Sequence, residues 1–176
     1  MNIIFLDVDG VLNIMSDSYN SCAWINLSYD AVEPHLMKRL EYLIEQTDAY
    51  IVISSSWSEV QLKQVLEQKR FKYIDRILGR THRGQTDNPL NVPDERLIIQ
   101  QGTGIKFLEY RGDQINEWIH DNNFSGNYVV LEDEILDVCG ELCNSIPKEN
   151  VIEVDMNEGL SHKNVLEAIS ILKGSL

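Results

Sequence analysis

Short apolar runs rich in β-branched residues alternate along the chain with longer segments in which apolar residues recur every three or four positions. The runs predict buried strands, and the recurring spacing predicts amphipathic helices. Strands are expected at residues 2–6, 49–53, 73–78, 128–131 and 151–154, and helices at residues 34–47, from 57 to about 66, 112–122 and 161–173. With right-handed crossovers, this alternation predicts an α/β fold: a three-layer, Rossmann-like parallel sheet flanked by helices.

The helical segments also predict where helices begin and which side chains point inward. The serines at 54–56 are expected to supply the cap of the second helix. Residues 14–30 and 79–104 carry loop signals and lack the pattern of a folded lid, so we expect a single domain over residues 1–176 with no large cap. The inward positions are expected to be Val60, Leu62, Val65 and Leu66 in the second helix, and Val165, Leu166, Ile169 and Leu172 in the last.

The net charge of −13 opposes binding to nucleic acid or to an anionic membrane, because such binding depends on Lys and Arg releasing counterions. The charge is uneven. Residues 69–83 hold six of the fifteen basic residues and a single acid. Two interpretations stay open for this segment: a local basic patch, or a solvated helix end and loop.

The three cysteines, at positions 22, 139 and 143, form no Cys-x-x-Cys pair, and their odd number disfavours a disulfide framework. We therefore expect the cytoplasm or another reducing compartment. No apolar run approaches the ~20 residues of a membrane helix, and no basic leader precedes the first strand, so stable membrane insertion is not expected.

Two carboxylates, Asp7 and Asp9, follow the first predicted strand directly. An ionised pair about 4 Å apart costs on the order of 4 kcal/mol at an effective dielectric near 20, so the pair calls for a cation, a shared proton or full solvation. A solvated acidic turn is one interpretation. A calcium-binding EF-hand loop is excluded, because Val11 occupies the next ligand position and the preceding element is a strand.

Polar clusters also follow two other predicted strands: Ser54 after the second, and Glu132 with Asp133 after the fourth. In a doubly wound sheet, the carboxyl ends of these strands meet at one edge. Carboxylate-only ligands favour Mg²⁺ as the cofactor. The sequence contains no Cys/His cluster that would offer a zinc site.

The segment Asp7-Val8-Asp9-Gly10-Val11 resembles the first motif of the haloacid dehalogenase superfamily of phosphotransferases. Together with Ile53-Ser54-Ser55-Ser56-Trp57 and Arg111-Gly112-Asp113-Gln114-Ile115, it looks like the small phosphatase domains found in multi-domain RNA-repair proteins. The resemblance implies that Asp7 is the nucleophile and Asp9 the acid/base. It also implies that Asp7 and the backbone carbonyl of Asp9 bind the metal.

The remaining roles implied by the resemblance fall on residues far apart in sequence. Ser54 would hold a phosphate oxygen, with Ser55 or Ser56 as alternatives. Arg111 would neutralise the phosphoryl charge, with Lys106 as its competitor. Glu132 and Asp133 would complete the metal site, although the family commonly has Asp at the first position. Asp137 is expected to cap a helix, or else to serve as an outer ligand.

These features predict a Mg²⁺-dependent phosphomonoester hydrolase acting through an aspartyl-phosphate. An open site suits a phosphorylated macromolecule, and the net charge favours phosphoprotein, with phosphotyrosine the expected group, over nucleic acid. Trp24 and Trp57 are candidates for stacking on the substrate, with core packing the alternative for Trp57. A polynucleotide end phosphatase and a catalytically weak phosphate-binding or scaffold protein remain as alternatives.

Overall fold

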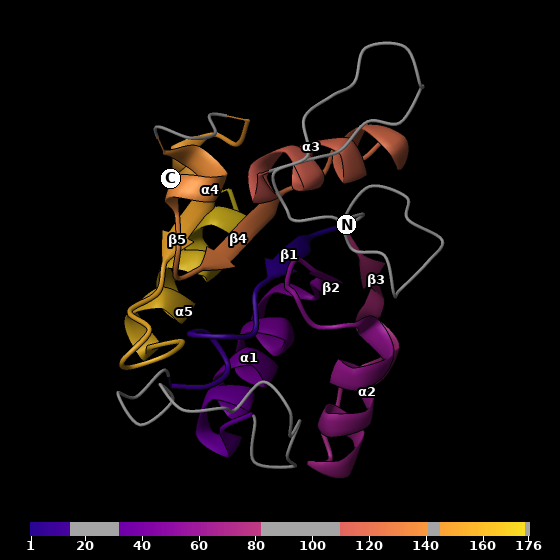
Figure 1. The fold of residues 1–176 in the computed structure, drawn as a ribbon, viewed down its shortest axis with the longest axis vertical. Coiled ribbons are helices and arrows are strands. Elements are labelled where there is room, and N and C mark those ends of the chain that lie inside the picture. The colour runs from indigo at the N-terminus through magenta and orange to yellow at the C-terminus, as the bar shows by residue number, and fades with distance from the viewer. Residues whose placement is uncertain (15–31, 82–109, 141–144, 175–176) are drawn as a thin grey trace, which may run out of the picture.

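A five-stranded parallel sheet forms the centre of the protein, seen in a computed structural model that describes residues 1–14, 32–81, 110–140 and 145–174 (Figure 1). The order of the strands across the sheet is β3-β2-β1-β4-β5, and each neighbouring pair is parallel. The strands are β1 (Ile3–Leu6), β2 (Tyr50–Ile53), β3 (Ile77–Arg80), β4 (Tyr128–Glu132) and β5 (Val151–Glu153).

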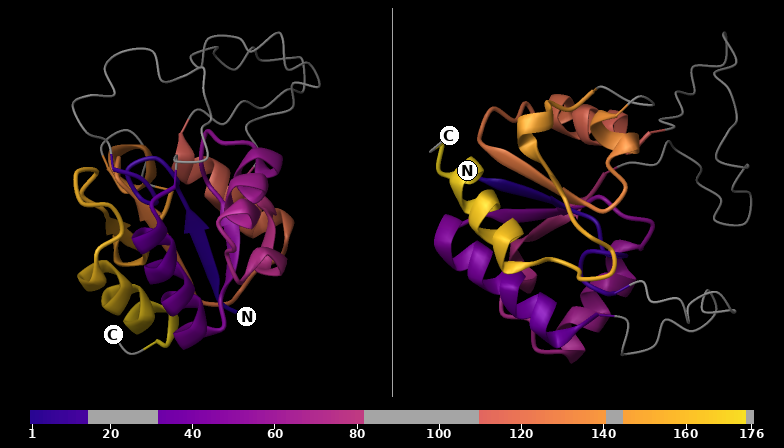
Figure 2. Two further views of the ribbon diagram at one scale, coloured as in Figure 1. Left: turned by 90° about the horizontal axis from the view of Figure 1, so that it is seen from below. Right: turned by 90° about the vertical axis from the view of Figure 1, so that its left-hand side faces the viewer.

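Helices cover both faces of this sheet (Figure 2). The helices α1 (Pro34–Thr47), α2 (Glu59–Gln68) and α5 (His162–Leu172) pack on one face, and α3 (Arg111–Asp121) and the short α4 (Leu136–Cys139) pack on the other. Two short 3₁₀ helices, Ile74–Arg76 and Lys148–Asn150, precede β3 and β5. The predicted three-layer α/β fold is confirmed.

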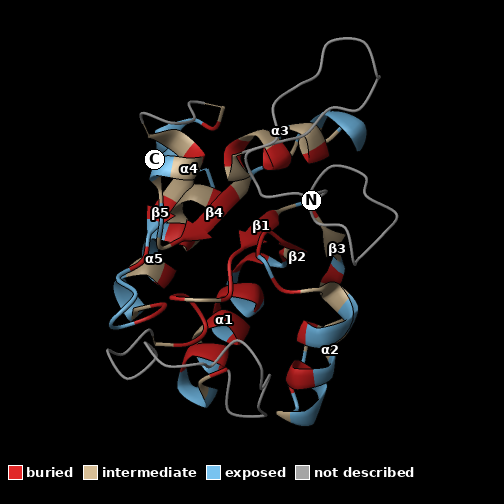
Figure 3. Cartoon of the chain, viewed as in Figure 1, coloured by how far each residue is buried: buried red, intermediate tan, exposed pale blue. Residues whose placement is uncertain are grey.

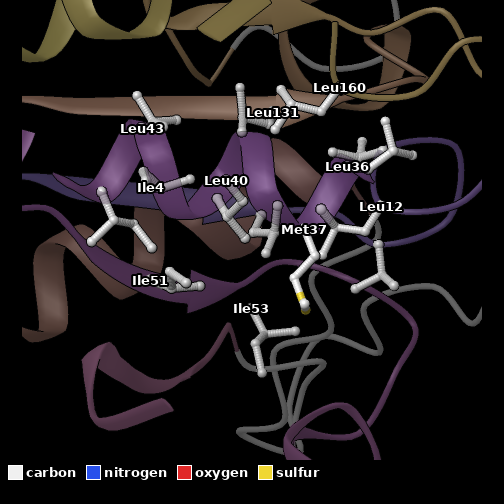
Figure 4. Close-up of a cluster of buried hydrophobic side chains, with 14 of the residues drawn as sticks. Ile4, Leu12, Leu36, Met37, Leu40, Leu43, Ile51, Ile53, Leu131 and Leu160 are labelled. Atoms are coloured by element: carbon white, nitrogen blue, oxygen red, sulfur yellow. The ribbon is translucent and has the colours of Figure 1, made fainter. Parts of the chain in front are cut away.

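The central strand β1 is buried on both faces and separates two hydrophobic clusters (Figure 3). Ile4 and Leu6 join the cluster beneath α1, α2 and α5, part of which is drawn in Figure 4, whereas Ile3 and Phe5 join the cluster beneath α3 and α4. Successive side chains of a strand point to opposite faces, so four apolar residues in a row suit a strand covered by helices on both sides. Each such burial stabilises the fold by roughly 1.5–3 kcal/mol.

The third strand begins and ends later than predicted. We expected a strand at 73–78, but residues 74–76 form a 3₁₀ turn and β3 runs from Ile77 to Arg80. The pairing with β2 passes from Ile77 to Gly79, so Leu78 is an extra bulged residue and 47% exposed. Gly79 has φ +143°, a conformation that side chains rarely adopt, so the glycine that suggested a loop instead permits a bulge.

Three details of the helix predictions were wrong. The cap of α2 is Ser58, which forms a capping box with Gln61, and not one of the serines at 54–56. Val60 is 67% exposed and Leu166 is 52% exposed. The buried face of each helix is formed by apolar residues three or four positions apart. Val60 and Leu166 lie beside these faces and not within them.

No helix within the described residues is long and apolar enough to cross a membrane. The described ranges also contain no folded cap inserted between strands. The predicted loop segments 14–30 and 79–104 lie mostly outside these ranges, apart from residue 14 and residues 79–81.

Candidate active site

The site lies where the direction of chain winding reverses in the sheet. From β1 the chain moves outward to β2 and β3, while β4 and β5 lie on the other side of β1. The backbone N–H of Asp7 donates to the Leu131 carbonyl at 3.0 Å, and the N–H of Ser54 donates to the Leu6 carbonyl at 2.8 Å. Asp7, Ser54 and Glu132 therefore stand side by side at the carboxyl edge of three adjacent strands, the usual ligand position in such sheets.

Asp7, Glu132 and Asp133 bring three carboxylate oxygens within 4.8 Å of one another. Asp7 and Glu132 are only 5% and 4% exposed. Gly10 has φ +70°, and a Cβ there would collide with the Asp133 carboxylate. A glycine in the first motif thus lets the fourth-strand carboxylate lie close over the turn.

Burial changes the protonation of this cluster. It raises the pKa of Asp7 to about 6, against the opposing charge of Arg111. It also raises the pKa of Glu132 to about 9, with the charge of Asp7 adding to the effect. In the absence of a cation, the two buried carboxyls therefore stay protonated at pH values above those at which Asp and Glu ordinarily lose their protons.

Arg111 is the first residue of α3, and its Nε lies 3.6 Å from Oε2 of Glu132. The Arg111 Nη1 and the Ser54 Oγ are buried and have no hydrogen-bond partner. Buried donors are nearly always hydrogen-bonded in proteins, so this pair of unsatisfied groups indicates a place for an anionic oxygen ligand.

The residues present fit Mg²⁺. The cluster offers oxygen ligands only, two of them buried, and Oε2 of Glu132 accepts no hydrogen bond. Mg²⁺ uses one or two carboxylates and fills its other positions with water or substrate phosphate. The longer Glu132 side chain lies in the same cluster as Asp133, so the cluster does not depend on Asp at the first position of this motif.

The Asp9 carboxylate is not part of the three-carboxylate cluster found among the described residues. It accepts a hydrogen bond from Nε1 of Trp57 at 3.1 Å and another from Nδ2 of Asn13 at 2.8 Å. Trp57 is only 7% exposed and packs in the larger hydrophobic cluster. The suggestion that Trp57 stacks on a substrate was therefore wrong, and core packing is the alternative that holds.

Among the other expected residues, the Ser55 side chain hydrogen bonds the Asp7 carboxyl. Ser56 is exposed, and Asp137 lies in the first turn of α4. Lys106 and Trp24 lie outside the described residues.

The described part of the segment 69–83 brings one basic residue to this edge of the sheet: Arg80, the last residue of β3, donates from Nη2 to the Ser55 carbonyl at 3.2 Å. Two other basic residues of the segment lie elsewhere. Arg76 pairs with Asp48 at 2.6 Å, and Lys72 pairs with Glu45 at 3.1 Å. These pairs lie just before β2 and β3, at the amino ends of the strands. Nothing is described for residues 82 and 83.

Sequence reasoning missed three residues at the site. Asn13 and Trp57 hold Asp9, as described above. Thr81 follows β3 beside Ser54, and its buried Oγ1 has no hydrogen-bond partner. Thr81 would have been found by the same strand-end rule, had the end of the strand been placed at residue 80, two positions later than predicted.

Mg²⁺ is expected to raise the melting temperature of the protein more at pH 8 than at pH 5. Asp7 and Glu132, with pKa values raised to about 6 and about 9, bind protons in the metal-free folded state, and a cation has to displace them. The apparent affinity for Mg²⁺ therefore rises with pH. Thermal unfolding with graded MgCl₂ at constant ionic strength measures this, and an equal shift at both pH values would contradict it.

A comparison with protein families matches residues 3–165 to the HAD domain in Swiss Army Knife RNA repair proteins. No curated protein and no solved structure matches the chain at a comparable level. The matched range contains every strand of the sheet and all the carboxylates of the site. The resemblance seen in the motif residues is thus confirmed, and the chain belongs to the HAD domain family of Swiss Army Knife RNA repair proteins.

Proposed function

We propose that this protein is a Mg²⁺-dependent phosphomonoester hydrolase that works through an aspartyl-phosphate on Asp7. The observation that carries the proposal is the meeting of two kinds of group at one strand edge. Three clustered carboxylates call for a cation, and the buried, unpartnered donors of Ser54 and Arg111 call for an anion. A metal-bound phosphate monoester satisfies both.

In the proposed reaction an Asp7 oxygen attacks phosphorus in line, and the bond from phosphorus to the leaving oxygen breaks. Arg111 and Ser54 would bind the non-bridging phosphate oxygens and stabilise the charge that develops on them. Mg²⁺ held by Asp7, Glu132 and Asp133 would supply positive charge that keeps these carboxyls ionised and lessens their repulsion toward the phosphate dianion.

Asp9 would move the protons. It gives a proton to the leaving oxygen in the first step. In the second step it accepts a proton from the water that attacks phosphorus, which releases inorganic phosphate and restores the Asp7 carboxylate. Such general acid–base catalysis typically contributes 10²–10⁴-fold.

For the substrate, we propose phosphorylated polynucleotide ends ahead of phosphoprotein. The family is described as a domain of RNA repair proteins, which favours an RNA end. Phosphotyrosine was expected from the net charge of −13 and from an aromatic approach to the site. The buried position of Trp57 removes part of that second argument.

The test is a comparison of kcat/KM on 3′- and 5′-phosphorylated RNA oligonucleotides and on phosphotyrosine peptides, at low and moderate salt. We expect at least a tenfold preference for one oligonucleotide end. A preference for the peptides would mean that net charge decides the substrate. Acid quenching with ³²P-labelled substrate should trap a base-labile phosphoenzyme, whereas bound phosphate without one would favour the rival phosphate-binding protein.

Arg111→Met is expected to lower kcat/KM by about 10²–10³-fold, because it removes the charge beside the attacked phosphate. Arg111→Lys should fall between, since Lys keeps the charge and loses the forked donor geometry. Arg76→Met is the matched control, because Arg76 pairs with Asp48 at the opposite edge of the sheet. If Arg111→Met keeps wild-type kcat/KM, another cation such as Lys106 has the role.

A further inference from the structure

The Asp9 carboxyl is held at both oxygens by residues from two parts of the chain. Its Oδ2 accepts from Nε1 of Trp57 at 3.1 Å, and its Oδ1 accepts from Nδ2 of Asn13 at 2.8 Å. The Asn13 side chain is oriented in turn, since its Oδ1 accepts from the Gly10 N–H at 2.8 Å. Asn13 and Trp57 are each 7% exposed.

Trp57 itself has little freedom to move. Its ring packs in the hydrophobic cluster beneath α1, α2 and α5. Its backbone N–H donates to Ser55 Oγ at 3.4 Å, and the Ser55 side chain hydrogen bonds Asp7. The indole N–H is therefore a donor fixed by packing, and it connects the segment after β2 with Asp9, while Ser55 connects the same segment with Asp7.

We propose that Trp57 is a positioning residue for proton transfer by Asp9. The inference rests on the proposed function and names a contributor to it. An indole N–H only donates, so Oδ2 of Asp9 accepts from it whether or not Asp9 carries a proton. With Asn13 fixing the other oxygen, the plane of the carboxyl group is set. The proton to be transferred is then confined to the lone-pair directions that neither donor uses.

A misoriented acid costs most when the leaving group is poor. A nitrophenolate leaves without much protonation, whereas an alkoxide needs a proton during bond cleavage. Trp57→Phe is therefore expected to lower kcat/KM by about tenfold or more for an alkyl phosphate, and by less than threefold for p-nitrophenyl phosphate. The ratio kcat/KM is used because it reports the steps up to loss of the leaving group.

Two variants keep the test independent of folding. Site-specific replacement of Trp57 by 3-benzothienylalanine preserves the bicyclic shape and substitutes sulfur for the N–H, so the same loss is expected without a cavity. Trp118 is the control position for both changes, because it is a buried tryptophan that packs against Phe5 and Phe124 on the other face of the sheet. Trp118 variants should show no dependence on the leaving group.

A double-mutant cycle tests whether Trp57 acts through Asp9. In an Asp9→Asn background, Trp57→Phe should change kcat/KM less than twofold, because the group that it positions is gone. In addition, the Trp57 indole N–H resonance of the Mg²⁺-loaded protein should shift on Asp9→Asn. The same leaving-group effect in both backgrounds, or an indole resonance that does not respond, would overturn the proposal.

Failure of this inference is distinguishable from failure of the proposed function. If the Trp57 variants behave as wild type while Asp7→Asn is inactive and Asp9→Asn is sensitive to the leaving group, only the positioning role is wrong. If Asp7→Asn is as active as wild type, the phosphatase mechanism itself fails.

Discussion

Asp7→Asn is expected to lose on the order of 10³-fold or more in turnover and, in the absence of metal, to be more stable than the wild-type protein. The loss follows from removing the proposed nucleophile, since the amide oxygen cannot form a productive aspartyl-phosphate. The gain in stability follows from burial, because the Asp7 carboxylate is 5% exposed and burial destabilises its charged form in the folded state.

The size of the stability change depends on pH. The folded-state pKa of Asp7 is raised from 3.8 to about 6, so the penalty is absent below 3.8, grows across that interval and is complete above pH 6. The shift corresponds to about 3 kcal/mol. Urea unfolding in EDTA should show Asp7→Asn stabilised at pH 7.5 and close to wild type at pH 4.

Asp75→Asn is the control for this stability change, because Asp75 is exposed in the 3₁₀ turn before β3. It should change the unfolding free energy by less than 0.5 kcal/mol or so at either pH. An Asp7→Asn protein that is inactive and less stable at pH 7.5 would show that the carboxylate contributes structure that burial does not outweigh.

Removing the metal is expected to reduce turnover to background, and Mg²⁺ should restore it. Asp133→Asn should require at least about tenfold more Mg²⁺ for half-maximal activity, because it removes one of the three clustered carboxylates proposed to bind the ion. Glu134→Gln is the matched control, since this neighbouring side chain is exposed and outside the cluster. Turnover that persists in EDTA would refute the metal requirement.

The parts of the site that could be predicted are those fixed by strand ends. Asp7, Ser54 and Glu132 each follow a short apolar run, and parallel pairing necessarily brings such residues to one edge. Arg111 could be placed at the start of a helix by its periodicity. The Arg111 Nε lies 3.6 Å from Glu132 Oε2, which agrees with the positive charge expected beside the carboxylates.

The parts that could not be predicted depend on how side chains meet in three dimensions. A tryptophan after a strand gives no sign that its N–H bonds a carboxylate 48 residues away in sequence. Gly79 likewise carries the same signal whether it begins a loop or permits a bulge, and only the register with β2 distinguishes them. Local patterns cannot resolve either choice, because the deciding partner is distant in sequence.

Because β1 pairs directly with β4, the site is completed late during synthesis. The register joins Leu6 to Leu131, which are more than one hundred positions apart, so a long loop has to close before these strands meet. A ribosome-bound chain that ends before Tyr128 contains Asp7 and Ser54 but lacks Glu132 and Asp133, at the end of β4. The proposed metal site is therefore incomplete, and the proposed activity absent, until the residues after Leu131 have been made and have left the ribosome.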